Sequence, residues 1–369
     1  MKSCWLGALI SVLLILLACA APAPPAAHTP MPESAPSPTP IPPPMPTITP
    51  TPEPKLPPVS TPTLPPTSQP IPQPPPLLTP IGPAPLLEGE IPIIDAHSQV
   101  DEYVELEKII RLMDEGGVAG TILATRGELP LEELVSFAKS YPTRIIPALR
   151  TKGIMQKTDV EYRVRLKKQV SMFKFGGMAE VLMFHAEKGD KAPEVIVQPD
   201  DERLLTALDS AVEEKWPFIA HIEFAAAGTQ REEFMTKFEA LLLRYPEHPF
   251  VLIHMGQLDH MGVQRLIDAY QNIYFITAHS NSAIKYAEFW PGTNMFEGKR
   301  LDTNWKKLMV KNPDRFILGF DNVFAGHWGQ FYLKQIGFWR EAMKDLPSEV
   351  AHAFAHGNAE RLWHLKLMN

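Results

Sequence analysis

The sequence predicts an α/β fold: a (β/α)8 barrel of the TIM-barrel type, preceded by a signal peptide and a disordered proline-rich stalk. Most of the 40 prolines lie before residue 92, so the composition separates a stalk from a globular remainder. The remainder, residues 89–369, is close to the length of about 250 residues that is typical of this barrel. It contains eight strand-like runs that alternate with helix-like segments, which predicts a parallel sheet with helical crossovers.

The net charge and the cysteines exclude several classes of function. The chain has a formal net charge of −7, so there is no basic excess that would indicate nucleic acid as a partner. The two cysteines, Cys4 and Cys19, both precede residue 89. The globular part therefore contains neither disulfides nor thiolate metal ligands.

The first residues predict export. Lys2 supplies a positive charge, and residues 5–17 are apolar but too short to span a bilayer comfortably. They end in Leu-Leu-Ala-Cys at 16–19, which looks like a bacterial lipobox with Cys19 as the lipidated residue. We expect residues 1–18 to be removed and the protein to be an extracytoplasmic lipoprotein of a bacterial cell membrane. The alternative is an ordinary signal peptide that happens to contain a cysteine.

The stalk covers residues 19–88 and consists largely of Pro, Ala, Thr and Ser. Such a composition buries too little apolar surface to fold. We expect an extended spacer of the polyproline II type, which rises about 3.1 Å per residue.

The globular part is expected to alternate strands and helices along its whole length. The expected strands lie at 91–99, 118–125, 144–149, 178–185, 218–223, 250–254, 272–279 and 315–321. The expected helices lie after Asp101, at 131–140, 158–175, 204–215 and 230–244, after Asp259, and twice after residue 321. Asp101 and Asp259 are the expected N-caps of their helices, and residues 281–301 are expected to form a loop over the site. An open doubly wound sheet is disfavoured, because no strand is followed by a glycine-rich phosphate turn.

Polar side chains gather at the ends of these strands. Because the carboxyl ends of parallel strands in a barrel face one mouth, side chains far apart in the sequence should meet there. His97 and Gln99 are two residues apart and should share a side of their strand. The residues expected at this mouth are His97, Gln99, Glu180, His221, Glu223, His254, His279 and Asp321.

The motifs at these positions resemble the amidohydrolase superfamily, in its amidohydrolase-related branch. The matching stretches are D-A-H-S-Q at 95–99, A-H-I-E at 220–223, L-I-H-M-G at 252–256, L-G-F-D at 318–321 and G-N-A-E-R-L-W at 357–363. The resemblance implies a (β/α)8 barrel that binds a metal through His97, His221 and Asp321, with His254 as a further site residue. Glu180 stands where some branches have a metal-binding glutamate.

One position departs from the family pattern. The family has an H-x-H pair on strand one, whereas Gln99 stands in place of the second histidine. A neutral amide oxygen is a poorer ligand than imidazole, so Gln99 is expected to be a weak ligand that Glu180 supports with a charged oxygen. The ion would be Zn²⁺, Mn²⁺ or another divalent cation. The alternative is a barrel that has lost its metal, with Gln99 bonded to a neighbour or a ligand.

Further residues have less specific signals. Arg126 and Arg150 follow strands two and three, and either could bind a substrate carboxylate, although surface arginines are common. His279 is expected to contact substrate or simply to pack. Glu223 shares a face with His221 and would orient it, or would be a solvated loop carboxylate. His185 is interpreted as an ordinary loop histidine.

The resemblance implies metal-assisted hydrolysis of an amide, lactone or other ester bond in a small molecule. In that mechanism metal-bound water has a lowered pKa, Asp321 is the general base and His254 stabilises the oxyanion. Two alternatives stay open. One is non-oxidative decarboxylation, as in aminocarboxymuconate-semialdehyde decarboxylase. The other is a metal-free, surface-tethered binding protein that uses the barrel mouth as a receptor.

Overall fold

The structure is a computed structural model that describes residues 78–86, 88–154, 157–189, 192–284 and 291–368. The expected signal peptide, Cys19 and the stalk up to residue 77 lie outside the described residues. Within the described residues, no helix combines the length and apolar character needed to cross a membrane.

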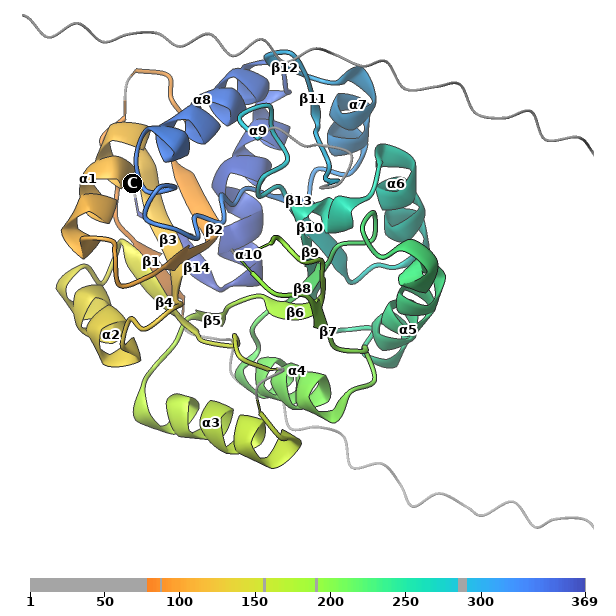
Figure 1. Ribbon diagram of the computed structural model, residues 1–369. Helices are drawn as coiled ribbons and strands as arrows, with labels where there is room; N and C mark the ends of the chain where they lie inside the picture. Colours follow the sequence, from red (N-terminus) through yellow and green to blue (C-terminus); the bar gives the residue numbers. More distant parts are fainter. Residues whose placement is uncertain (1–77, 87, 155–156, 190–191, 285–290, 369) are drawn as a thin grey trace, which may run out of the picture. The chain divides into compact units, whose positions relative to one another are not determined.

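Eight parallel strands of the described chain form a barrel (Figure 1). Their bounds are β2 (Ile93–Val100), β3 (Val118–Thr125), β4 (Ile145–Leu149), β5 (Gly177–Met178) continued by β6 (Val181–His185), β8 (Phe218–Ile222), β9 (Phe250–Ile253), β10 (Ile273–Ile276) and β13 (Phe316–Ile317). Each pairs in parallel with the next in the order β2-β3-β4-β5 and β6-β8-β9-β10-β13. The sequence predicted all eight strands.

Two seams close this barrel. At the first, strand four is split: β5 pairs with β4 and β6 pairs with β8, with two residues between them. At the second, the last strand returns to the first. The amide of Ala96 donates to the carbonyl of Leu318 (3.0 Å), and the amide of Asp321 donates to the carbonyl of His97 (2.8 Å). The barrel prediction is therefore confirmed by strand pairing around the full circle.

Eight helices surround the barrel (Figure 1). They are α1 (Leu106–Gly116), α2 (Leu131–Ser140), α3 (Asp159–Met172), α4 (Glu202–Glu214), α5 (Arg231–Arg244), α6 (His260–Ala269), α7 (Thr303–Lys311) and α8 (Gln330–Lys344). The chain then adds α9 (Ser348–His352), a π-helical turn (Ala353–Gly357) and α10 (Asn358–Leu362). The expected cap at Asp259 is confirmed, because its side chain accepts from the amide of Gly262 (2.8 Å).

The expected cap at Asp101 is wrong. Helix α1 starts four residues later than such a cap requires, after Glu105, whose side chain makes no capping bond. Asp101 instead accepts from the amide of Tyr103 (3.2 Å) and so closes a local turn. An aspartate can bond to a backbone amide two residues ahead in a turn as well as at a helix start, and sequence spacing does not separate the two.

The apolar core has two layers. Inside the barrel lie small and β-branched side chains, among them Ile94, Ala96, Ala124 and Ile219. A larger set fills the space between the strands and the helices. The barrel interior is therefore packed, and polar groups find room only at its mouth.

The packed region begins earlier in the chain than residue 89, the boundary predicted from the sequence. Strand β1 (Thr79–Ile81) pairs in parallel with β14 (Leu365–Leu367), and Ile81 is fully buried in the inner core. Ile81 follows a proline in a proline-rich stretch, so the composition assigned it to the stalk. A single pair of three-residue strands has no hydrophobic period that would reveal it.

A bulge in β2 determines where the first site residues point. Asp95 pairs with Thr121 and Ser98 with Leu123, so β2 carries one more residue than β3 over this step. An extra residue reverses the side-chain alternation beyond it. Ala96 faces the inner core, and the bulge brings His97 and Gln99 to the inside as well.

The segment expected to cover the site, residues 281–301, is only partly described. Residues 285–290 lie outside the described residues. The remainder includes a short antiparallel hairpin, β11 (Phe296–Glu297) and β12 (Arg300–Leu301). Phe296 packs edge-on against Trp339 of α8, with ring centroids 4.9 Å apart. This hairpin therefore belongs to the outer layer.

Candidate active site

The carboxyl ends of six strands bring the expected polar side chains together. His97, Gln99, Glu180, His221, Glu223, His254 and Asp321 are all buried, and His279 is half-buried beside them. Three trios have ligand atoms within 4.8 Å of one another and share members. They are His97 with Glu180 and Asp321, Glu180 with His221 and His254, and His254 with His279 and Asp321.

Three of these residues have left-handed backbone conformations. The φ angles are 55° at His254, 57° at His279 and 46° at Asp321. Each follows the last residues of its strand, where the chain turns out of the barrel. Non-glycine residues rarely adopt positive φ, and such conformations tend to occur at functional sites.

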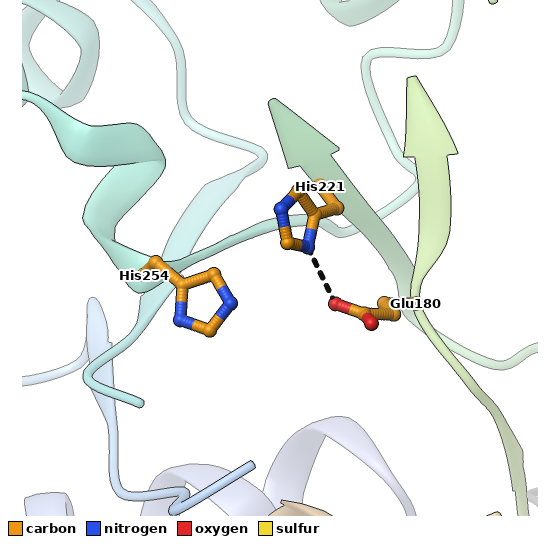
Figure 2. A group of neighbouring side chains, drawn as sticks. All are labelled: Glu180, His221 and His254. Atoms are coloured by element: carbon orange, nitrogen blue, oxygen red, sulfur yellow. Dashed lines mark hydrogen bonds and ion pairs between the residues drawn. The ribbon is translucent and has the colours of Figure 1, made fainter. Parts of the chain in front are cut away.

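Glu180 accepts hydrogen bonds through both carboxylate oxygens. Its Oε1 accepts from Gln99 Nε2 (3.0 Å) and from Lys152 Nζ (2.8 Å). Its Oε2 lies 2.7 Å from Nδ1 of His221, and Figure 2 shows this bond with the His254 ring beside it. Burial alone would raise the pKa of Glu180, but the charges of Lys152 and His221 lower it well below its ordinary value.

Gln99 bridges the two central carboxylates. Its amide nitrogen donates to Glu180 Oε1 (3.0 Å) and to Asp321 Oδ1 (2.9 Å) and lies 3.5 Å from His97 Nε2. Its buried Oε1 has no hydrogen-bond partner among the described residues. The opposite amide orientation would direct that oxygen at two carboxylates, which only an intervening cation would make favourable.

Asp321 is surrounded by imidazoles. Its Oδ1 lies 3.5 Å from His97 Nε2, and its Oδ2 lies 3.5 Å from His254 Nε2 and 3.8 Å from His279 Nδ1. Burial and the Glu180 carboxylate would raise the pKa of Asp321, but the bond with His97 and the proximity of His279 lower it below its ordinary value. Asp321 is therefore ionised at neutral pH.

The protonation of His254 is constrained from two sides. Burial and the nearby charge of His221 lower its pKa, so the ring is neutral at neutral pH. Its Nδ1 lies 3.0 Å from the carbonyl oxygen of Ala278 and donates a hydrogen bond to it, so Nδ1 carries the proton. The lone pair is then on Nε2, facing Asp321. In this form His254 binds a cation or accepts a proton, and the oxyanion role expected for it requires a protonated ring.

His221 lies between two carboxylates. Its Nδ1 faces Glu180, and its Nε2 is 3.4 Å from Glu223 Oε1. Burial would lower the pKa of His221, but the charge and hydrogen bond of Glu180, together with Glu223, raise it to about 9. Both oxygens of Glu223 also accept from Lys188 Nζ at 2.9 Å. Glu223 is thus part of a buried ion-pair network and not a solvated loop carboxylate.

His185 is closer to the site than an ordinary loop histidine would be. Its ring centroid lies 5.2 Å from that of His221, and it forms a further trio with His221 and Glu223. Burial lowers the pKa of His185 to about 4. It is therefore a neutral member of the wall at the end of β6.

The two arginines have different surroundings. Arg126 donates to the carbonyl of Val323 (3.1 Å), two residues after Asp321, and its guanidinium lies 4.3 Å from the ring centroid of Phe324. Arg150 donates to the carbonyl of Gly127 (2.8 Å) and lines a surface cleft between α2 and α3. The structure therefore brings Arg126 to the rim of the mouth, and it does not bring Arg150 to the cluster.

Three side chains at the mouth were not expected from the sequence: Lys152, Lys188 and His327. Lys152 and Lys188 lie in the loops that follow strands three and four. These loops have no apolar pattern from which the direction of a side chain could be predicted. His327 contacts the ring of His279, with centroids 5.6 Å apart, and Nδ1 accepts from the amide of Val323 (3.1 Å). A basic residue within a few positions of a strand end was the available signal, and many surface loops share it.

The donor set fits a divalent cation. In one trio, His97 offers an imidazole nitrogen and Glu180 and Asp321 offer carboxylate oxygens, a mixture that suits Zn²⁺ and Mn²⁺. His221 would join after losing its proton, and Gln99 Oε1 after rotation of its amide. The unpartnered, buried Oε1 supports this fit, because buried polar atoms normally have a partner.

The comparisons with known proteins identify the family. The sequence profile of the amidohydrolase family matches residues 163–365, more than half of this chain. The chain therefore belongs to the amidohydrolase family. A comparison with proteins of curated function returned no match.

Several solved structures are similar. An uncharacterized TIM-barrel protein of Bordetella bronchiseptica is 17% identical, with 70% of this chain and 82% of that chain covered and a TM-score of 0.47. An amidohydrolase of Burkholderia multivorans with bound zinc is 12% identical, with 70% and 88% covered and a TM-score of 0.45. A 5-carboxyvanillate decarboxylase of Novosphingobium aromaticivorans with bound manganese is 14% identical, with 70% and 81% covered and a TM-score of 0.42.

Proposed function

We propose that this protein is a metal-dependent hydrolase that cleaves an amide, lactone or other ester bond of a small molecule at the barrel mouth. The observation that carries the proposal is the trio of His97, Glu180 and Asp321. These buried side chains come from strands one, four and eight and direct their ligand atoms into one space. Burying two carboxylates together is costly unless cations or donors compensate them.

The proposed cation ligands are His97, His221, Glu180 and Asp321, with Gln99 as a weak oxygen ligand. A divalent cation held there would supply Lewis-acid chemistry, since it would lower the pKa of bound water toward about 7 and polarise the scissile carbonyl. The ion is Zn²⁺ or Mn²⁺ in this proposal, since both accept imidazole and carboxylate ligands.

The protein groups move the proton in this mechanism. Asp321 is ionised and accepts the proton of the attacking water as general base. Because the pKa of Asp321 is low, it does not retain that proton strongly. His254 Nε2 lies 3.5 Å from Asp321 Oδ2 with its lone pair toward it. His254 is therefore placed to receive the proton and pass it to the leaving group.

Substrate recognition is proposed to involve the rim of the mouth. Arg126 carries a fixed positive charge beside the exposed ring of Phe324 and would bind an anionic group of the substrate. His279 is half-buried and would contact the substrate directly. Glu223 acts on the site through His221, which it holds in place.

The test is hydrolysis by the full chain after loading with Zn²⁺ or Mn²⁺. A panel of lactones, 4-nitrophenyl esters and amides is assayed together with elemental analysis, and release of CO₂ from aromatic carboxylates is measured in parallel. Metal that disappears in His97→Ala, together with hydrolysis that disappears in Asp321→Asn, supports the proposal. Release of CO₂ without hydrolysis would establish decarboxylation instead. Absence of metal from the wild type would favour a binding protein.

We also propose that the protein is tethered through a lipid on Cys19. The support is the apolar run at 5–17 that ends in Leu-Leu-Ala-Cys. Mass spectrometry of the mature N-terminus from a membrane fraction tests this. An unmodified terminus, or cleavage at another residue, would contradict it.

A further inference from the structure

The lone pairs that a cation would use on Glu180 and Asp321 already have donors from the protein. Gln99 Nε2 donates to one oxygen of each carboxylate, at 3.0 Å and 2.9 Å. Lys152 Nζ donates to Glu180 Oε1 at 2.8 Å. A hydrogen bond between charged groups is stronger than one between neutral groups, so the Lys152 contact is the stronger competitor.

The loop that carries Lys152 is held in place by α3. Arg165 donates to the backbone carbonyls of Lys152 (2.6 Å) and Thr151 (3.1 Å), and Tyr162 donates to Thr151 as well (3.1 Å). Thr151 also donates to the carbonyl of Glu180 through its hydroxyl. These bonds position the ammonium group, whose side chain is 22% exposed, against a carboxylate that is almost fully buried. The contact is therefore built into the fold.

Lysine side chains of the protein already pair with two of the carboxylates at the mouth. Lys152 Nζ lies 2.8 Å from Glu180, and Lys188 Nζ lies 2.9 Å from Glu223. A divalent ion bound by Glu180 would therefore meet the Lys152 ammonium group unless that group withdrew.

We propose that the Lys152 ammonium group and the Gln99 amide nitrogen act as internal donors to Glu180 and Asp321, so that a divalent metal binds only by displacing these two donor groups. The inference rests on the proposed function for the identity of the metal ligands. Two consequences follow. The metal is held weakly and exchangeably, and the fold of the mouth persists after the metal leaves. Lys152 and Gln99 then act on catalysis through metal affinity, as positioning residues.

The test measures metal affinity directly. The full chain is stripped with a chelator and titrated with Mn²⁺ and, separately, Zn²⁺ in competition with a fluorescent chelator. Lys152→Met removes the ammonium but keeps most of the side chain. Because a hydrogen bond to a charged group is lost, it should lower the Kd by about tenfold or more. Lys152→Arg keeps the charge and should bind metal about as the wild type does.

Gln99→Leu separates two roles for that residue. Leucine fills a similar volume without donor or ligand atoms. If Gln99 mainly competes with the metal, Gln99→Leu lowers the Kd. If Gln99 is mainly an oxygen ligand, the Kd rises and this part of the proposal falls.

Lys188→Met is the matched control. It also removes one lysine charge from the mouth, but Lys188 pairs with Glu223 and not with Glu180. A change in Kd that is common to Lys152→Met and Lys188→Met reports the general loss of positive charge. The effect specific to Lys152 is therefore the ratio of the two Kd values. A ratio near one, or weaker binding in Lys152→Met, overturns the proposal. Melting temperatures provide a second measurement if a variant is fragile: in chelator Lys152→Met should melt below the wild type, and Mn²⁺ should restore it.

The outcomes distinguish this inference from the proposed function. Tight metal binding by the wild type that is unchanged in Lys152→Met contradicts the inference alone. Tighter binding in Lys152→Met without hydrolysis by any variant supports the inference and contradicts the hydrolase proposal. If no protein of the series binds metal, both fall.

Discussion

The Nδ1 atom of His221 lies 2.7 Å from the Oε2 atom of Glu180, and both side chains are buried. In a buried site this contact favours the imidazolium form, because the carboxylate compensates its charge. Burial alone would lower the pKa of His221, yet Glu180, together with Glu223, raises it from 6.5 to about 9. The pair therefore links stability to pH.

The first prediction is a loss of stability at alkaline pH in chelator-treated protein. Because the pKa of His221 is higher in the folded state than in the unfolded state, protonated His221 stabilises the folded protein below pH 6.5. This contribution is lost as the pH rises through about 9. The full shift corresponds to about 3 kcal/mol. Urea unfolding between pH 6 and 9.5 measures it. Glu180→Gln should flatten the curve, whereas Glu360→Gln, which removes a carboxylate beside His356, should not. A flat curve for the wild type would count against the His221–Glu180 ion pair.

The second prediction concerns Asp321. Asp321→Asn preserves shape and tolerates the left-handed backbone, but it removes the proton acceptor. We expect kcat to fall by about 10²–10⁴-fold, the range for loss of general base catalysis. The control is Asp302→Asn, which keeps an N-cap side chain at the start of α7 and should retain activity. Near-normal turnover in Asp321→Asn would remove Asp321 from the mechanism.

The third prediction separates the two arginines. Arg126→Met should raise KM for an anionic substrate by about 10–100-fold with little change in kcat, because a charged hydrogen bond to the substrate is lost. Arg150→Met is the matched control and should leave KM unchanged, since Arg150 bonds to Gly127 outside the cluster. An equal change in KM for an anionic substrate and for its neutral analogue would show that Arg126 does not recognise the charge of the substrate.

The fourth prediction tests the early start of the packed region. Ile81→Ala should lower the free energy of unfolding by about 2–5 kcal/mol, the usual cost of removing a large aliphatic side chain from a core. Leu78→Ala is the control, because Leu78 is 56% exposed whereas Ile81 is 0% exposed. Chemical denaturation measures both. Equal stabilities would mean that β1 does not belong to the core.

The convergence of the site residues could be predicted because parallel strands deliver their ends to one mouth. An apolar run that ends in His254 or in Asp321 shows locally that the residue lies at a strand end. His97 and Gln99 are two residues apart, which predicts that they share one side of their strand. The bulge that turns these two inward involves the pairing of β2 with β3, which the sequence of one strand does not contain.

Other features depend on tertiary contacts. The direction of Lys152 is determined by Arg165 and Tyr162 on α3, so no local pattern indicates that it reaches Glu180. Arg150 is one residue beyond the end of β4, where alternation no longer predicts direction, and it turns toward Gly127. Strand β1 becomes visible only through its partner β14 at the other end of the chain.

The positive φ angles at His279 and Asp321 have a consequence for laboratory evolution of this protein. Glycine and asparagine occupy that backbone region more readily than most residues. Replacing His279 or Asp321 by either of them would therefore relieve backbone strain. A library selected for heat resistance alone would enrich such replacements, and a replacement of Asp321 would remove the proposed general base. Screens for a more robust protein therefore need turnover as a second criterion from the first round.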